Sequence, residues 1–338
     1  MYGIFHALCF VGALILSIAF AQADELDIPE FSIPLRCDFP NDCVVQNYMD
    51  VRPGPGVRDF RCGTLSYERH KGTDFRVLNY PLFSQGVKVL AAADGTVLRV
   101  KEGQEDGAYI REEGKLTPRT EEGNSVVVQH KGGWQTLYEH LRKRSITVKV
   151  GDAVQVGDAL GVVGLSGKSE FTHLHFEIMH GYNSYDPFMG ALAEGCLYRT
   201  SNSFWNALAQ DKLKYIETGI VESGFSSEIP HQKQLPFSDE RKRIALRQDA
   251  KLLIYWVEVF GVKIADRITL IYVDPAGKIS KSQKVVKNNQ ASYFKYYGIN
   301  RPEEGWLSGK YKGAVLLERI VEGKWQIVFS DNTDVTYP

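Results

Sequence analysis

The chain has 338 residues, of which 43% are hydrophobic and 24% are charged, and this composition excludes a disordered or fibrous protein. The length is enough for two ordinary domains, each with its own core. The formal net charge of -1 at pH 7 gives no reason to expect nucleic acid or another polyanion as a partner.

Residues 1–23 have the pattern of a secretory signal peptide. They contain no Asp, Glu, Lys or Arg, an almost wholly apolar run extends from Ala7 to Phe20, and Ala21-Gln22-Ala23 offers small residues at its first and third positions. The run is shorter than the ~20 residues that cross a bilayer, which disfavours the alternative of an uncleaved membrane anchor. We therefore expect an exported protein, periplasmic or secreted, that is cleaved before Asp24 and has no membrane span after cleavage.

Four cysteines remain after this cleavage, and an even number in an exported chain indicates two disulfides. Three pairings are possible. We favour a short loop closed by Cys37 and Cys43, together with a bridge from Cys62 to Cys196 that ties the start of one domain to its end. A structural zinc site is the alternative, and it is disfavoured because no close C-x-x-C pair is present.

Residues 24–60, rich in Pro, Asp and Asn, are expected to form an extended, disulfide-tied N-terminal segment. Residues 61–196 contain short Val-rich strands between Gly-containing turns, which indicates a compact all-β domain. A charged stretch, Lys101–Glu122, interrupts this rhythm and is expected to be a long exposed hairpin or loop. The expected strands of this domain are Val87–Ala92, Thr96–Val100, Ser125–His130, Thr136–Leu141 and Leu160–Val163.

Residues 197–235 have the pattern of a connector, with a short helix expected at Phe204–Gln210 and Ser203 as its cap. In residues 236–338 the strand pattern returns, which predicts an accessory β-sandwich domain and a chain that is mostly β. The expected strands of this part are Lys251–Phe260, Arg267–Val273, Tyr293–Tyr297, Lys312–Glu318 and Lys324–Phe329, with a turn at residues 274–277.

The first motif that carries chemistry is His70-Lys71-Gly72-Thr73-Asp74. A spacing of four residues places the side chains of His70 and Asp74 on one face of a strand. Gly72 allows the backbone to bend between them. Imidazole and carboxylate groups are both good zinc ligands, so the pair is a candidate for part of a metal site.

The second motif, residues 172–178, alternates clearly. We expect Leu174, Phe176 and Ile178 to face a core, and His173, His175 and Glu177 to share the opposite face. A third group, Tyr138-Glu139-His140-Leu141, ends a strand that follows a Gly132-Gly133 hairpin.

Together these motifs predict a catalytic zinc site. His70, Asp74 and His175 supply three protein ligands and leave the fourth position open for water, which the metal acidifies. His140 and His173 then lie beside the water. One takes its proton and the other stabilises the oxyanion or protonates the leaving amine, and the sequence leaves the division of these roles open.

The remaining histidines of the mature chain lack such a pattern. His130 and His180 have no partner motif, and His231 lies in the expected connector. We expect none of the three to take part in the site.

The order and spacing of these motifs across residues 65–180 resemble the LytM/lysostaphin family of zinc endopeptidases. The matching segments are His70–Asp74, Gly86–Val97, Tyr138–Leu141, Gly151–Val154 with Gly157, Gly161 and Gly164, and His173–Glu177. Two positions depart from the family pattern, namely Thr172, where many members have Pro, and residues 167–171, which differ from the usual Gly-x-Ser-Thr-Gly run.

The resemblance implies an antiparallel β-sheet groove related to the lipoyl-like barrel-sandwich hybrid. It implies one Zn²⁺ per chain on His70, Asp74 and His175, with His140 and His173 as the catalytic histidines. The substrate would be peptide cross-links or bridges of bacterial peptidoglycan, and we expect a monomer. The two departures bear on substrate preference.

Three other functions are alternatives for this sequence. A catalytically silent regulator of wall hydrolases on the same fold is disfavoured because all five site positions are present. A lipoyl-type carrier needs a Lys at a hairpin tip, and the sequence offers none in the expected setting. A peptidase that acts on proteins instead of peptidoglycan stays open.

Overall fold

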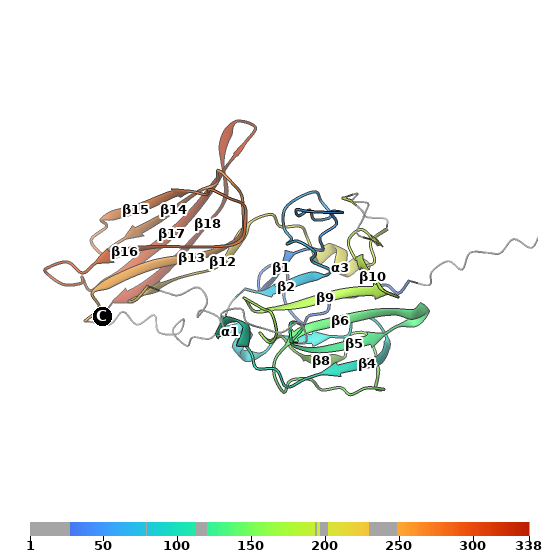
Figure 1. Cartoon of the computed structure of the whole chain (residues 1–338). Helices are drawn as coiled ribbons and strands as arrows, with labels where there is room; N and C mark the ends of the chain where they lie inside the picture. The colour runs from blue at the N-terminus through green and yellow to red at the C-terminus, as the bar shows by residue number, and fades with distance from the viewer. Residues whose placement is uncertain are drawn as a thin grey trace, which may run out of the picture.

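A computed structural model describes residues 28–78, 80–111, 120–192, 195–196, 202–229 and 249–337. The expected signal peptide and His231 lie outside the described residues. The fold is mostly β, as predicted, with two β regions joined near β12 (Figure 1). Among the described helices, none has the length and apolar character needed to cross a membrane.

The N-terminal β region is built on one nine-stranded antiparallel sheet. Seven of its strands follow the order β1-β2-β9-β6-β5-β4-β7, while β10 pairs with β9 and β11 with β10. The strands are β1 (Cys43–Asn47), β2 (Thr73–Val77), β4 (Gly95–Lys101), β5 (Asn124–Gln129), β6 (Trp134–Leu141), β7 (Ala153–Val154), β9 (His173–His180), β10 (Asn183–Asp186) and β11 (Ala191–Leu192). The predicted strands of this region are confirmed within a few residues.

Smaller elements accompany this sheet in the N-terminal region. A two-stranded sheet pairs β3 (Lys88–Leu90) with β8 (Ala159–Val162). The helical pieces are α1 (Tyr80–Gln85), α2 (Ala108–Arg111), the 3₁₀ turn η1 (Lys131–Gly133) and α3 (Ala207–Lys212). The short helix α2 falls within the stretch that the sequence predicted to be only an exposed hairpin or loop.

Helix α3 begins later than predicted and has a different cap. The side chain of Asn206 accepts a hydrogen bond from the backbone N–H of Ala209. The hydroxyl of Ser203 instead donates to the carbonyl of Pro187, so the prediction of Ser203 as the cap is wrong. The Ser203 oxygen accepts a hydrogen bond from the N–H of Trp205, which precedes the helix, whereas Asn206 caps α3 directly.

The alternation predicted for β9 is confirmed. Leu174, Phe176 and Ile178 are buried in the main core, and Phe176 stacks on Trp205 with ring centroids 5.6 Å apart. Each such side chain contributes about 1.5–3 kcal/mol when it is fully buried. Because strand side chains alternate, this packing commits His173, His175 and Glu177 to the opposite face of the sheet.

The N-terminal segment is an integral part of this region and not only a tether. Its strand β1 forms the edge of the large sheet beside β2, and Phe31, Leu35 and Phe39 are buried in the main core. Both favoured disulfides, Cys37–Cys43 and Cys62–Cys196, are present.

The C-terminal region has two sheets that enclose a second core, as predicted for a β-sandwich. One sheet has the order β12-β13-β16 and the other β15-β14-β17-β18. The strands are β12 (Gly219–Ser226), β13 (Leu252–Val262), β14 (Arg267–Val273), β15 (Ile279–Val285), β16 (Gln290–Asn300), β17 (Gly309–Val321) and β18 (Lys324–Tyr337).

Two of these strands were not predicted. Strand β12 lies in the expected connector, and its sequence GIVESGFS includes two glycines and a glutamate, which weaken a strand pattern. Strand β15, ISKSQKV, lies at a sheet edge and buries none of its side chains. The pairing of β12 with β13 and of β15 with β14 stabilises these two strands.

Candidate metal and catalytic site

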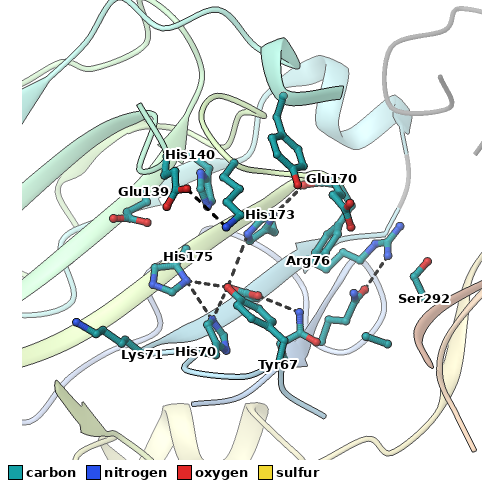
Figure 2. A pocket seen from close by; sticks show the side chains of 18 of the residues that line it. Tyr67, His70, Lys71, Arg76, Glu139, His140, Glu170, His173, His175 and Ser292 are labelled. Atoms are coloured by element: carbon teal, nitrogen blue, oxygen red, sulfur yellow. Dashed lines mark hydrogen bonds and ion pairs between the residues drawn. The ribbon is translucent and has the colours of Figure 1, made fainter. Parts of the chain in front are cut away.

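A groove of about 980 Å³ runs over the polar face of the large sheet (Figure 2). Strands β1, β2, β6 and β9 all contribute side chains to its floor. The five residues that the sequence singled out all line it, namely His70, Asp74, His140, His173 and His175.

Three of these residues form a tight group. Oδ1 of Asp74 lies 3.1 Å from Nε2 of His70 and 2.9 Å from Nδ1 of His175, and the two imidazole nitrogens are 3.1 Å apart. All three side chains are buried. The register of the sheet brings two of them together, because Asp74 on β2 pairs directly with His175 on β9.

The local backbone structure that brings His70 to Asp74 differs from the prediction. Strand β2 begins at Thr73, so His70 lies in the preceding loop, and the expectation that His70 and Asp74 share one strand face is wrong. The chain bends at Gly72 instead. A Cβ on Gly72 would lie 2.5 Å from the carbonyl oxygen of Phe176 and 2.8 Å from the ring of His175, so glycine is needed for this close passage.

The donor set fits a small divalent cation such as zinc. Tetrahedral Zn²⁺ with bonds of about 2.0–2.1 Å to nitrogen and oxygen has ligand atoms about 3.3 Å apart, close to the spacing found here. Nδ1 of His70 donates to the carbonyl of Tyr48 at 2.7 Å, which leaves the Nε2 lone pair directed at the group. Asn47 donates to the second oxygen of Asp74 at 2.9 Å and orients the carboxylate.

Electrostatics at this group favour a charged carboxylate. Burial alone would raise the pKa of Asp74, but the adjacent imidazoles of His70, His173 and His175 hold that pKa well below its usual range. Burial lowers the pKa of the His175 imidazole, but its hydrogen bond to Asp74 outweighs this effect and raises that pKa to about 9.

His140 and His173 present the same nitrogen to the groove. Nδ1 of His140 donates to the carbonyl of Ser166, and Nδ1 of His173 donates to the carbonyl of Phe171, both at 2.8 Å. The two rings lie 4.8 Å apart between centroids. Burial lowers the pKa of both imidazoles, so each is neutral at pH 7 with an Nε2 lone pair that can accept a proton.

The backbone at His140 has a φ of 64°, which is unusual for a residue other than glycine. Consecutive side chains of a regular strand point to opposite faces, but here both Glu139 and His140 line the groove. Glu139 pairs in register with His175, and burial raises the pKa of its carboxyl to about 7.

Two other histidines lie outside the groove. His130 contacts the carbonyl of Asp94 through Nδ1 and the hydroxyl of Thr136 through Nε2. His180 contacts the carbonyl of Gly132 at 3.0 Å. These contacts give both residues structural roles, in keeping with the expectation that they do not take part in the site.

The sequence did not point to several groove residues, namely Gln46, Asn47, Arg76, Glu258 and Ser292. Gln46 and Asn47 reach the groove together because a bulge in β1 interrupts its alternation between Val45 and Asn47. Glu258 offered a signal, since it is the one charged residue in the apolar run Leu252–Phe260.

Comparison with known proteins shows what this region is similar to. Residues 68–187 match the model of Peptidase family M23. This match confirms the resemblance to LytM-type peptidases that the sequence motifs indicated.

Among curated relatives, a Haemophilus influenzae protein described as an uncharacterized metalloprotease is 38% identical over 108 residues, or 32% of this chain and 18% of the relative. Peptidoglycan DD-endopeptidase ShyA of Vibrio cholerae is 33% identical over 110 residues, or 32% of this chain and 20% of that protein. The chain thus spans about a fifth of the length of these relatives.

Among solved structures, the catalytic domain of lysostaphin from Staphylococcus simulans is 24% identical, with 42% of this chain and 85% of that chain covered and a TM-score of 0.28.

Proposed function

We propose that this chain, whose residues 68–187 match Peptidase family M23, is an exported zinc-dependent endopeptidase that hydrolyses peptide cross-links or bridges of bacterial peptidoglycan. One observation carries the proposal. The three candidate ligand atoms of His70, Asp74 and His175 converge within about 3 Å of one another, and the neutral imidazoles of His173 and His140 lie beside them, with Nε2 of His173 3.6 Å from Oδ1 of Asp74 and the His140 ring centroid 6.1 Å from that of His175.

In this proposal His70, Asp74 and His175 hold the metal, and bound zinc would polarise the scissile carbonyl and acidify a water molecule. His140 and His173 handle the protons. The Nε2 of one accepts the proton of the attacking water and later returns it to solvent. The other takes up a proton from solvent and then stabilises the oxyanion or donates that proton to the leaving amine. The backbone carbonyls of Ser166 and Phe171 hold both rings in the required tautomer.

The substrate assignment draws on the relatives, because ShyA is described as a peptidoglycan DD-endopeptidase. The groove gives it physical support, since its volume of about 980 Å³ lies at the upper end of the roughly 300–1,000 Å³ that is typical of ligand sites. The two disulfides fit an oxidising compartment outside the cytoplasm. Residues 61–196 would carry the peptidase and residues 236–338 an accessory domain, in a monomeric protein.

Digestion of purified sacculi, followed by mass spectrometry of the muropeptides, tests this function. The full mature chain should convert cross-linked dimers to monomers. His140→Ala and His173→Ala should abolish this conversion while zinc content stays near one equivalent. His180→Ala, a partly exposed histidine outside the groove, is the matched control and should retain activity. Release of intact stem peptides from the glycan would indicate an amidase, and unchanged muropeptides together with cleavage of protein substrates would indicate a protein peptidase.

A further inference from the structure

The groove is not made by the N-terminal region alone. Glu258 on β13, together with Ala291 and Ser292 on β16, lines the groove from the C-terminal β-sandwich. Figure 2 shows Ser292 at the side of the site where Arg76 lies, on a strand of the C-terminal region. A C-terminal domain whose only role was to anchor the enzyme to another structure would not need to line this groove.

A buried ion pair joins the two regions at this place. Nη2 of Arg76 donates to Oε1 of Glu258 at 2.7 Å, and each side chain is 5% exposed. The hydroxyl of Ser292 donates to the same carboxylate oxygen at 3.0 Å, and Nη1 of Arg76 donates to Gln46 at 2.7 Å. Loss of either charge would leave the other charge buried with only neutral partners among these contacts, which is costly, so this pair fixes the position of Arg76.

Arg76 in turn contacts the surroundings of His173. The two residues pair directly in the register of β2 and β9. The guanidinium of Arg76 lies over the ring of Phe171, 4.7 Å from its centroid, and the carbonyl of Phe171 accepts the hydrogen bond from Nδ1 of His173. The ring of Phe171 also lies 4.5 Å from that of His173. A continuous series of contacts therefore runs from Glu258 to His173.

We propose that the C-terminal β-sandwich completes the substrate groove, with Glu258 as a positioning residue that acts on His173 through Arg76 and Phe171, and with Ser292 as a specificity-determining residue that contacts the peptide. The inference rests on the proposed function, because the substrate it names is the peptide of that reaction. Its consequence is that substitutions in the C-terminal region change the kinetics of hydrolysis without removing the metal ligands.

The experiment uses the full mature chain and two matched pairs of variants. Glu258→Gln removes the charge that faces Arg76, and Glu318→Gln removes a carboxylate of the same region that pairs with Arg267 outside the groove. Ser292→Trp adds bulk to the groove wall, and Ser330→Trp adds the same bulk at an exposed position of β18. Zinc content, kcat and KM on a cross-linked muropeptide dimer, and the ¹⁵N signals of the histidine rings are measured for each.

We expect Glu258→Gln to lower kcat about tenfold with zinc content unchanged, since small displacements of a catalytic group have effects of this order or larger. The ring signals of His173 should shift in Glu258→Gln and not in Glu318→Gln. Ser292→Trp should raise KM several-fold, whereas Ser330→Trp should behave as wild type.

Two failures are distinguishable. If wild type cleaves the dimer but both groove variants match their controls and His173 signals do not move, the inference is wrong and the proposed function stands. If wild type cleaves no muropeptide, the proposed function is wrong, and the His173 signals alone decide whether Glu258 positions that ring.

Discussion

Asn47 donates a 2.9 Å hydrogen bond to Oδ2 of Asp74, the oxygen that does not face His70 and His175. The N-terminal segment therefore reaches the candidate metal site, because Asn47 ends β1 and β1 lies beside β2. Both side chains are buried, so water cannot replace the amide without rearrangement. Asn47 orients the proposed ligand Asp74 and does not itself belong to the proposed ligand group.

Asn47→Ala should weaken zinc binding by about 10–100-fold, the usual effect of removing a group that orients a metal ligand. The measurement is zinc affinity by competition with a chromophoric chelator. Asn41→Ala removes an exposed amide that pairs with Asp38 in the same segment and serves as the control. Equal zinc affinities for the two variants would contradict the orienting role of Asn47.

Gly72→Ala should also impair the metal site. Its Cβ would lie 2.5 Å from the backbone of β9 and 2.8 Å from the His175 ring, so β9 or the ligand must move. We expect zinc affinity to fall at least about tenfold. Gly298→Ala, where the nearest atom is 3.4 Å away, should leave it unchanged. Wild-type affinity in Gly72→Ala would show that the loop adapts without moving the ligand.

The two disulfides should differ in their contributions to stability. Cys62 and Cys196 are 134 positions apart, whereas Cys37 and Cys43 are six apart. On loop-closure entropy alone, the long bridge should contribute about 5 kcal/mol to the free energy of unfolding and the short bridge about 2 kcal/mol. Urea unfolding of the two Cys→Ser double variants measures both values. A larger loss from the short bridge would contradict this ranking.

Asp186 should make stability depend on pH. Burial raises the pKa of its carboxyl to about 7, because hydrogen bonds from the N–H groups of Met189 and Phe188 only partly offset that burial. The folded state then binds more protons than the unfolded state between about pH 4 and pH 7, so stability falls as pH rises through this window.

Asp186→Asn keeps a neutral acceptor and removes this dependence. The variant should be more stable than wild type at pH 8, and the difference should shrink toward pH 4. Urea unfolding at both pH values is the test. A difference of equal size at the two pH values would show that folding does not raise the pKa of Asp186.

Much of the site could be predicted from the sequence because strand alternation is a local property. Leu174, Phe176 and Ile178 alternate with His173, His175 and Glu177, and that pattern alone assigns the faces of β9. The grouping of His70 with Asp74 was also predicted, although for the wrong reason, since a bend at Gly72 and not a shared strand brings them together.

The contacts that were missed depend on register and packing between distant segments. Strand β1 is buried along its whole length and shows no alternation, so its sequence does not indicate which strand it joins. Arg76 and Glu258 are 182 positions apart in the sequence, and they belong to two regions that each have their own hydrophobic core. Neither local propensity nor hydrophobic period carries information about such a pair.

The most direct test of the central claim is the rate at which cross-linked muropeptide dimers disappear after metal removal and zinc return. The purified mature chain is stripped with a chelator, and zinc is added back in fractions of an equivalent. A catalytic site made by His70, Asp74 and His175 predicts no hydrolysis in the stripped protein and full recovery at about one equivalent of zinc. Hydrolysis that persists without metal, or that zinc fails to restore in a protein that stays folded, would contradict it.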